Sequence, residues 1–385
     1  MFLTENTPPL KDTRVRSEAA MAAQLGHRVT VIGPSATSAY EEQVVDGITV
    51  LGFPLRPSRG GVMGYLREYL SAASWTMRLL TRVRAAGTID LVHAANPPDF
   101  LLLLALPLKL GGTKLVFDHH DLAPELFEAK FGARPAISRL LRVLERLSFR
   151  LADAVVTTNS SYARVTFERG CRPRRLVIAP NLPELEAFTP VCPDPSLKKG
   201  AEYLVTWVGT MGSQDGIDLA VAALGCLAGM RDDWRAVFAG QGEMLRPAQE
   251  LARSLGVADR IDFPGFQSRD DVRTLVSSAD VCLAPDPKTR FNDLSTMIKV
   301  TEYLALGKPV VAFDLVETRR LAQDAAVYAD DDSPLAFARA LDLLLSDEGR
   351  RCEMGARGRE IMLETGGWRR SVERLTALWE ELLPA

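Results

Sequence analysis

The sequence has little of several features that mark particular classes of protein. Its five cysteines lie far apart and form no Cys-x-x-Cys pair, which argues against a disulfide scaffold and is typical of reduced thiols in a cytoplasm. The formal net charge is only −3, so no excess of positive charge points to nucleic acid as a partner. The N-terminus lacks a basic segment followed by an apolar core, so we expect no signal peptide.

Long hydrophobic runs are lacking as well. The longest one, "FLLLLALPLKLGG" from Phe100, is shorter than the roughly 20 apolar residues that a membrane-spanning helix needs. It predicts instead a buried helix that begins after the turn "NPPD". The segment "GQG" at 240–242 lacks the third glycine of a dinucleotide-binding fingerprint, so we do not interpret it as a dinucleotide site.

What the chain does have is a regular alternation of short apolar segments and amphipathic helical stretches. A first series predicts a very short N-terminal strand and buried strands at 28–33, 91–95, 114–118, 154–159 and 175–180. A second series predicts the strands "YLVTWVG" (from Tyr203), "RAVFAG", "IDFPG", "VCLAP", "PVVAF" and "AVYA". Between them, residues 182–200 hold four prolines without periodicity, which is typical of a linker.

With 385 residues the chain is too long for one ordinary core, and two successive βαβα series predict two parallel-sheet domains. The predicted fold class is α/β, with two Rossmann-like domains that face each other across a cleft. The first domain spans 1–181 and the second 201–367, and we expect the amphipathic helix 368–385 to pack back on the first. A cleft between strand ends is the default place for a ligand.

The order of motifs resembles that of glycosyltransferases with the GT-B fold, specifically the retaining family-4 type that uses nucleotide-sugar donors. In the first domain the motifs are "DTRVRSEAAMAAQLGHRVTVIGP", "DLVHAANPP", "FDHHDLAPELF" and "VVTTNSSYARVTFERG". In the second they are "VGTMGSQDGIDLAVAAL", "FAGQGEM", "IDFPGF", "ADVCLAPD" and "KVTEYLALGKPVVAFD". Each is weak alone, but the ordered set covers nearly the whole chain. The resemblance implies transfer of a hexosyl unit with retention at the anomeric carbon, in polysaccharide or glycoconjugate biosynthesis.

Two of the four histidines, His119 and His120, stand side by side at the end of a predicted strand. Adjacent residues of a strand point to opposite faces, so we expect only one of them to face a ligand. The resemblance assigns His120 to the family's strand-end histidine, which lies near the transferred sugar, and an imidazole can exchange hydrogen bonds or protons with a hydroxyl. We therefore predict His120 as the catalytic residue and expect His119 to pack against the sheet. The alternative is a strand terminus without a catalytic role.

The segment "TMIKVTEYLALGKPVV" predicts a helix between two strands, with Lys299 and Glu302 on one face. Diphosphates are bound by cationic side chains, backbone amides and helix N-termini. The resemblance assigns the phosphates of the donor to Lys299 and its ribose hydroxyls to Glu302. The alternative for such a pair is a solvated ion pair.

The chain departs from the family at the first of the two glutamates that the family usually has, because Leu294 occupies that position. We expect Asp293, Ser295 or backbone amides of the same loop to contact the sugar instead.

A second departure follows the first strand of the second domain, where Thr210 and Asp215 replace a basic pair. Gly209 and Gly212 still permit close approach of the backbone to a donor. The diphosphate is then expected to rely on Lys299, on loop amides and on Arg14, with a metal ion as another source of positive charge. No cluster of His and Asp ligands announces a metal, however, so we predict none, and we predict no cofactor.

Residues 134–150 predict a helix with a basic side and an apolar side. The basic side holds Arg134, Arg139, Arg142, Arg146 and Arg150, and the apolar side holds Leu140, Leu141, Val143, Leu144 and Leu147. Such a helix can lie on an anionic membrane surface, at the inner face of the membrane, which would suit a lipid-linked acceptor sugar. A core helix with a solvated face is the alternative.

Together these features predict a cytoplasmic hexosyltransferase whose partners are a nucleoside-diphosphate sugar and an acceptor hydroxyl. Two alternatives stay open: a sugar-nucleotide 2-epimerase with the same fold, and a partner subunit that binds nucleotide without transferring anything.

Overall fold

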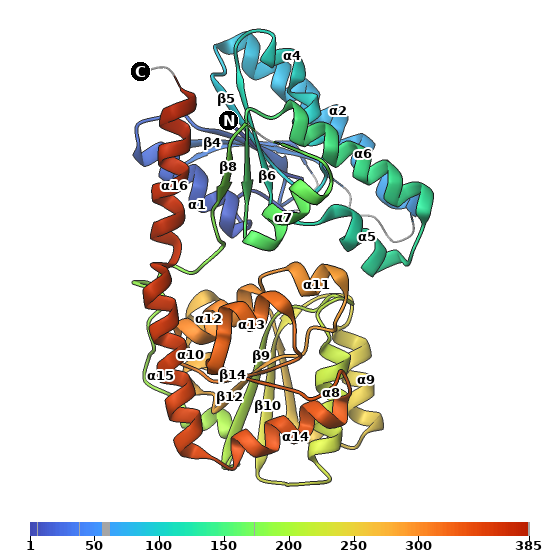
Figure 1. Cartoon of the computed structure of the whole chain (residues 1–385), viewed down its shortest axis with the longest axis vertical. Helices are drawn as coiled ribbons and strands as arrows, with labels where there is room; N and C mark the ends of the chain where they lie inside the picture. Colours follow the sequence, from blue (N-terminus) through green and yellow to red (C-terminus); the bar gives the residue numbers. More distant parts are fainter. Residues whose placement is uncertain (6, 38, 56–61, 173, 384–385) are drawn as a thin grey trace. The chain divides into compact units, whose positions relative to one another are not determined.

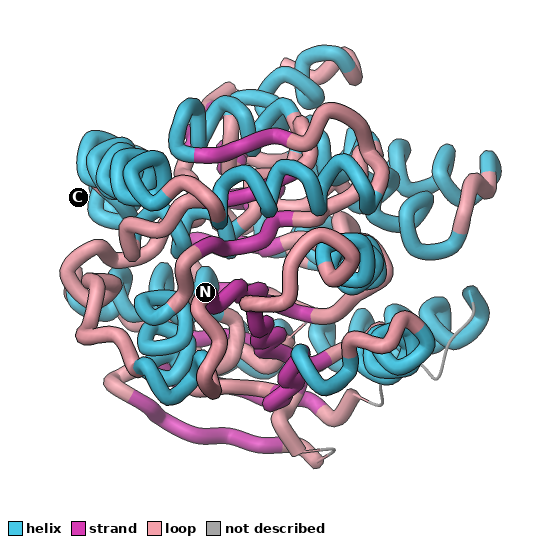
Figure 2. Tube along the Cα trace, turned by 90° about the horizontal axis from the view of Figure 1, so that it is seen from below, coloured by secondary structure: helices cyan, strands magenta, loops and turns pink. Residues whose placement is uncertain are grey.

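The structure is a computed structural model that describes the whole chain except residues 6, 38, 56–61, 173 and 384–385. The chain divides into two compact units, each a parallel sheet with helices on both faces (Figures 1 and 2). The first unit comprises Met1–Asn181 and Arg370–Ala385, and the second comprises Leu182–Arg369. The predicted fold class, two Rossmann-like α/β domains, is confirmed.

The sheet of the first unit has eight strands in the order β3-β4-β2-β1-β5-β6-β7-β8. The strands are β1 (Phe2–Leu3), β2 (Thr30–Pro34), β3 (Glu41–Val45), β4 (Ile48–Phe53), β5 (Leu91–Ala95), β6 (Lys114–His119), β7 (Ala154–Thr157) and β8 (Leu176–Ile178). All neighbouring pairs are parallel except β3 and β4, which form an antiparallel hairpin.

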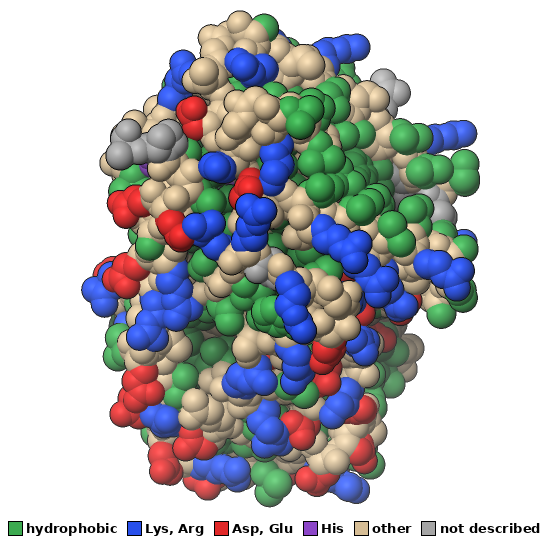
Figure 3. Space-filling model, turned by 45° about the horizontal axis from the view of Figure 1, so that its top comes forward, with side chains coloured by type: hydrophobic (Ala, Val, Ile, Leu, Met, Phe, Trp, Pro, Cys, Tyr) green, Lys and Arg blue, Asp and Glu red, His purple; other side chains and the backbone are tan. Residues whose placement is uncertain are grey.

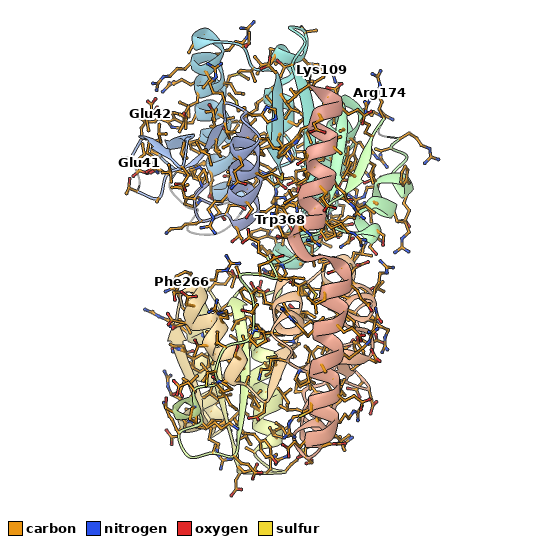
Figure 4. The ribbon with its side chains drawn as sticks, turned by 90° about the vertical axis from the view of Figure 1, so that its left-hand side faces the viewer. Glu41, Glu42, Lys109, Arg174, Phe266 and Trp368 are labelled. Carbon is orange, nitrogen blue, oxygen red and sulfur yellow. The ribbon has the colours of Figure 1, made fainter. Side chains whose placement is uncertain are left out.

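The hairpin of β3 and β4 is the part of this sheet that the sequence pattern did not predict. β3 carries the charged sequence "EEQVV" and lies at the edge of the sheet, so it lacks the apolar run that marks a buried strand. Glu42 pairs with Arg82 of α2 at 2.8 Å, and Figure 4 shows Glu41 and Glu42 on this outer strand. Charges on an edge strand discourage pairing with another chain.

Helices cover both faces of this sheet. They are α1 (Thr13–Gln24), α2 (Val62–Ala86), α3 (Leu101–Leu104), α4 (Leu106–Lys109), α5 (Ala123–Phe131), α6 (Pro135–Leu151), α7 (Ser160–Glu168) and α16 (Gly367–Leu382). The apolar run from Phe100 forms α3 and α4 in place of one helix, because Ala105 and Pro107 interrupt it. No described helix is both long and apolar enough to cross a membrane.

Strand alternation divides the side chains of β6 between the two faces. Leu115 and Phe117 belong to a core cluster with α2, α3 and Phe149 of α6, whereas Asp118 contacts Arg14 of α1. On the face of β1 and β5 that α16 covers, Trp379 makes edge contacts with Phe2 and His93.

The second unit has a six-stranded sheet, entirely parallel, in the order β11-β10-β9-β12-β13-β14. Its strands are β9 (Tyr203–Thr210), β10 (Trp234–Gln241), β11 (Ile261–Gly265), β12 (Val281–Ala284), β13 (Val310–Ala312) and β14 (Ala326–Tyr328). Its helices are α8 (Ile217–Leu227), α9 (Leu245–Ser254), α10 (Arg269–Ser278), α11 (Arg290–Leu294), α12 (Ile298–Ala305), α13 (Val316–Ala322), α14 (Pro334–Leu345) and α15 (Glu348–Thr365).

The segment 182–200, expected to be a linker, differs from that prediction because much of it is part of the second unit. Leu182, Leu185 and Phe188 are buried in the same core cluster as α10 and α12. The prolines remove helical periodicity, but they do not prevent three apolar side chains from anchoring the segment.

Each sheet has one point where the strand order reverses. In the first unit β1 and β5 are neighbours, and the chain continues from them in opposite directions. In the second unit the same holds for β9 and β12. Open α/β sheets bind ligands outside the carboxyl ends of the strands at such a switch point.

The backbones of β9 and β10 lie in close contact near the ends of the two strands. A Cβ atom added at Gly240 of β10 would lie 1.8 Å from the Gly209 carbonyl oxygen, and Gly240 has a φ of +150°. Gly240→Ala must therefore separate the two strands, and we expect it to lower the free energy of unfolding by about 3 kcal/mol. Urea unfolding followed by the fluorescence of the buried Trp207 and Trp234 measures this change.

Gly256→Ala is the matched control, because Gly256 also has a positive φ, +70°, but has nothing within 4 Å of the added Cβ. It should cost only the backbone strain of a left-handed residue, about 1–2 kcal/mol. Equal loss of stability in the two variants would contradict the steric argument.

Candidate functional site

The first polar group lies on the α1 face of the first unit's sheet, at the end of β6. The Asp118 carboxylate accepts hydrogen bonds from Arg14 Nε at 2.8 Å and from Arg14 Nη2 at 3.0 Å. Arg14 Nη1 donates to the Ala179 carbonyl oxygen at 3.0 Å, so three donors of the guanidinium are directed inward. Arg14 was predicted to bind the donor, but here it is buried and holds Asp118 in place.

His120 lies beside this pair. Its Nδ1 is 3.3 Å from Asp118 Oδ2, and its side chain is 18% exposed, whereas Asp118 is fully buried. Burial acts to lower the pKa of His120, but the hydrogen bond and the charge of Asp118 raise it to about 9. His120 is therefore an imidazolium at neutral pH, and its Nε2, which makes no hydrogen bond within the described residues, is a donor.

The charge of Asp118 is maintained by the same contacts. Burial alone would raise its pKa, but the Arg14 guanidinium and the hydrogen bond with His120 hold the pKa well below its usual range. A carboxylate that is always charged fixes both the orientation and the protonation of the imidazole beside it.

The turn that follows His120 is held by Asn96, which comes directly after β5. Asn96 Oδ1 accepts hydrogen bonds from the backbone N–H groups of His120 at 2.8 Å and Asp121 at 3.0 Å. Its Nδ2 donates to Asp99 Oδ1 at 2.8 Å and to the Asp121 carbonyl oxygen at 2.7 Å. The position of the His120 side chain is thus set by two neighbouring strands.

His119 faces the opposite side of the sheet, as the strand alternation predicted. It is fully buried, with Nε2 3.1 Å from Glu145 Oε1 and its ring 4.9 Å from that of Phe149. Arg169 pairs with both Glu145 and Glu125, so this second group is an internal ionic network. His119 is therefore part of the core.

Glu18, His93 and Asp118 are close enough to serve as metal ligands, because one ligand atom of each lies within 4.8 Å of the others. Arg14 Nε, however, is 3.2 Å from Glu18 Oε1 and 2.8 Å from Asp118 Oδ2. The guanidinium thus already contacts the oxygens that a cation would need. His93 is buried in mid-strand, stacked on Phe2 at 5.2 Å.

The second polar group lies in the second unit, at the carboxyl ends of β9 and β12. Lys299 in the first turn of α12 is buried, and its Nζ lies 2.7 Å from Asp286 Oδ1 and 3.8 Å from Asp215 Oδ1. The ammonium also stands over the Trp207 ring, 5.1 Å from its centroid. The Gly212 N–H donates to Asp215 Oδ2 at 3.0 Å, which closes the loop after β9. The switch point of this sheet is therefore lined by one cation and two carboxylates.

Several buried acceptors of this group have no hydrogen-bond partner within the described part of the chain. They include Asp286 Oδ2, Asn292 Oδ1 and Gln214 Oε1. Asn292 is held by its Nδ2, which donates to the Gln214 carbonyl oxygen at 2.8 Å and to that of Pro287 at 2.9 Å. Burial raises the pKa of Asp286, against the opposing effect of Lys299. Buried acceptors without partners are costly, and hydroxyl groups of a ligand would satisfy them.

Glu302 lies one turn further along α12. Its carboxylate is half-buried and makes no hydrogen bond or ion pair within the described residues. Burial raises its pKa to about 7, with the charge of Arg269 acting in the opposite direction. Lys299 is paired with Asp286 and not with Glu302, so the predicted alternative of a solvated Lys299–Glu302 pair does not occur.

The other predicted donor-binding residues lie at the end of β9 and around α11. Gly209, the last but one residue of β9, has a φ of +150°, and a Cβ there would meet the Trp207 ring at 3.3 Å. Asp293 Oδ1 accepts a hydrogen bond from the Val316 N–H at 2.9 Å, so it stabilises the start of α13. The buried Ser295 hydroxyl donates to the Phe291 carbonyl oxygen at 2.6 Å. Both polar side chains thus make contacts that hold the loop itself.

The structure brings His120 and Arg14 together in the first unit, and Lys299, Gly212 and the loop of Asp293 together in the second. Sequence reasoning missed Asp118, Asn96 and Asp286, which are central to the two groups. Each of them ends or follows a buried strand, at the sheet edge where α/β proteins bind ligands. A search for polar residues at those positions would have found them.

Two family models match the chain. Residues 12–181 match the model described as "Glycosyl transferase 4-like domain", and residues 193–361 match "Glycosyl transferases group 1".

Individual proteins agree with these matches. The chain is 28% identical over 365 residues to D-inositol 3-phosphate glycosyltransferase of Salinispora tropica, covering 88% of this chain and 73% of that protein. It is 30% identical over 273 residues to GDP-mannose-dependent alpha-(1-6)-phosphatidylinositol dimannoside mannosyltransferase of Mycobacterium tuberculosis, covering 69% of this chain and 67% of that protein. The solved structure of sucrose-phosphate synthase from Thermosynechococcus elongatus superposes with a TM-score of 0.81 at 16% identity, covering 99% and 98% of the two chains. The chain therefore belongs to the glycosyltransferases of the GT-B fold and family-4 type.

Proposed function

We propose that this glycosyltransferase moves a hexosyl unit from a nucleoside-diphosphate sugar to an acceptor hydroxyl, with retention at the anomeric carbon. The observation that carries the proposal is the buried group of Lys299, Asp286 and Asp215 at the switch point of the second unit. It combines a cation with acceptors that lack partners, which suits a phosphorylated sugar. The relative from Mycobacterium tuberculosis is named as GDP-mannose-dependent, which supports a nucleotide-sugar donor.

In this proposal each residue has one task. Lys299 neutralises charge on the departing diphosphate, and the acceptors of Asp286 and Asn292 receive hydrogen bonds from sugar hydroxyls. Glu302 accepts hydrogen bonds from the ribose. His120, as an imidazolium, donates from Nε2 to an oxygen of the transferred sugar or its phosphate, where negative charge develops. Arg14 acts through Asp118 and His120, and the task predicted for Asp293 and Ser295 passes to Asp286.

The acceptor is proposed to be a polyol or a lipid-linked sugar. The two relatives are named for inositol 3-phosphate and for a phosphatidylinositol dimannoside, both of which carry a polyol and a phosphate. A role in the synthesis of a glycoconjugate follows from such an acceptor.

One assay separates this proposal from its two rivals. The protein is incubated with a panel of nucleotide sugars, and both free nucleoside diphosphate and epimerised donor are measured. Release of diphosphate that an added acceptor accelerates supports transfer. An epimer without an acceptor would indicate the 2-epimerase, and nucleotide binding without any turnover would indicate a non-catalytic subunit.

We also propose that α6 rests on the surface of an anionic membrane. The face of α6 toward the sheet holds Ser138, Glu145, Ser148 and Phe149, all buried. Its apolar stripe points outward instead, with Leu140, Val143 and Leu147 exposed by 57%, 44% and 39%. The alternative, a core helix with a solvated face, would place the leucines toward the sheet, where the four buried residues lie instead. An apolar stripe beside arginines is typical of helices that lie in a membrane interface, and Figure 3 shows apolar and basic side chains gathered on one face of this unit.

A prediction for the donor site concerns Glu302. If its carboxylate accepts two ribose hydrogen bonds, Glu302→Gln should weaken nucleoside-diphosphate binding by about 1.5–3 kcal/mol, the contribution of hydrogen bonds to a charged group. Since its pKa is about 7, wild-type affinity should rise as the pH increases through 7 and the carboxylate becomes charged, and the variant should lack this dependence. Calorimetric titration at pH 6 and pH 8 tests both. Unchanged affinity in a folded variant would remove Glu302 from the site.

A second prediction compares the adjacent histidines. His120→Ala should leave nucleotide affinity nearly unchanged and lower turnover by about 10²-fold or more, the loss typical of a single preorganised donor. Because the pKa of His120 is about 9, wild-type turnover should hold through neutral pH and fall as the pH passes 9.

His119→Ala is the control, because it removes the partner of Glu145 on the opposite face of the sheet. It should lower stability by about 1–3 kcal/mol and leave turnover largely intact. If His119→Ala is the slow variant, the assignment of roles to the two histidines is reversed.

A third prediction tests the membrane contact. Changing both Leu140 and Leu147 to Ser should reduce co-sedimentation with vesicles of phosphatidylglycerol by about tenfold or more, because each buried leucine contributes up to about 1.5–3 kcal/mol. The control changes Leu343 and Leu363 of the second unit, exposed by 63% and 56%, to Ser as well, and it should sediment with vesicles like the wild type. Wild-type protein that never sediments with such vesicles would leave α6 without this role.

A further inference from the structure

A hollow on the surface of the first unit is lined by none of the residues of the two polar groups described above. It has a volume of about 420 Å³ and is formed by α5, α6 and the loop between them. Four arginines line it, Arg134, Arg139, Arg142 and Arg146, and Glu128 is the only acidic residue in its wall.

The arginines are only partly neutralised by the protein itself. Arg142 Nη2 is 3.5 Å from Glu128 Oε1, at the limit of a hydrogen bond. Arg134, Arg139 and Arg146 make no salt bridge with any described residue. Arg139 and Arg146 lie on one side of α6, seven residues apart, and Arg134 directly precedes the helix. Three exposed guanidinium groups therefore stand around one hollow without a carboxylate partner among the described residues, and they are free to contact an anion.

The floor of the hollow provides a second, independent observation. Ser138 is only 3% exposed, and its hydroxyl has no hydrogen-bond partner within the described residues. It also lines the hollow, so the buried hydroxyl and the arginines share one space. A hydroxyl that is buried beside cations and lacks a partner is suited to donate to an anion.

We propose that this hollow is a binding site for the phosphate group of an organic phosphate ester. A guanidinium group can donate two parallel hydrogen bonds to the oxygens of a phosphate. Three or four guanidinium groups around one hollow therefore favour a doubly charged phosphate ligand over a singly charged carboxylate ligand. The volume leaves room for the alcohol to which the phosphate is esterified. The ester is either a soluble acceptor or the headgroup of a lipid, since the exposed stripe of Leu140, Val143 and Leu147 adjoins the arginines on α6. The inference extends the proposed function to a phosphate-bearing acceptor, but binding at this site does not require transfer.

The test uses the full-length protein without a donor and two probes, glycerol 3-phosphate by calorimetry and phosphatidylglycerol vesicles by co-sedimentation, with phosphatidylcholine vesicles as the neutral reference. The double variant Arg139→Gln, Arg146→Gln should bind at least tenfold more weakly, because it removes two charge-assisted contacts. Ser138→Ala should bind the probes severalfold more weakly than the wild type, as expected for the loss of one neutral hydrogen bond. The matched control is Arg16→Gln, Arg246→Gln, which removes the same charge from exposed positions outside the hollow and should bind like the wild type.

If only the variants of the hollow lose binding of a probe, the result supports a phosphate site in the hollow. Loss of glycerol 3-phosphate binding identifies a soluble ester, and loss of vesicle binding alone identifies a lipid phosphate. Equal loss in the control variant, or no binding of either probe by the wild type, overturns the proposal. Turnover of donor by the same variants is measured separately, so failure of this site and failure of the proposed transferase activity give different results.

Discussion

The buried ion pair of Arg14 and Asp118 is the interaction on which the first unit's polar centre depends. It joins α1 to the end of β6 and, through the Ala179 carbonyl oxygen, to the segment that follows β8. Burying two charges is costly unless they pair and form hydrogen bonds, and here three guanidinium donors and both carboxylate oxygens do so. The pair therefore fixes Asp118 as a charged group, and Asp118 in turn determines the protonation and orientation of His120.

Because side chains alternate along β6, its two faces carry two different polar groups. Asp118 and His120 lie toward α1, whereas His119 lies toward α6, in the network of Glu145 and Arg169. That network occupies the inner face of α6 with polar groups, so the leucines of this helix cannot be buried there. The apolar stripe of α6 therefore lies on its outer side, where Leu140, Val143 and Leu147 are exposed.

The second unit also has a buried group of charged side chains at its switch point. The strand order of its parallel sheet reverses between β9 and β12, and the loops that leave these strands place Asp215 and Asp286 around Lys299. Gly216 lets the loops after β9 and β12 approach closely, because a Cβ there would lie 2.0 Å from the Pro285 carbonyl oxygen. The family's usual basic pair is missing here, and the group carries two carboxylates for one cation. In the proposed function, Lys299 would then be the one cation of this group that neutralises phosphate.

The sequence by itself determined the two-domain α/β architecture, because period-two and buried apolar segments mark strands without any knowledge of their partners. The segment 91–95, for example, forms β5 with the predicted bounds. The sequence also predicted His120, Lys299 and Glu302 as site residues through a family resemblance. The matched models confirm the family, and the roles of these residues stay predictions. The sequence could not predict the β3–β4 hairpin, whose edge position permits charged residues, or the anchoring of 182–200 by three apolar side chains. Only the tertiary structure decided which groups meet. Arg14 is 104 residues from Asp118 in the chain, and Lys299 is 13 residues from Asp286, across a segment that includes the short helix α11. The orientation of α6 belongs to the same class, because both of its sides satisfy a helical pattern and only the buried charges beneath it select the one that turns inward.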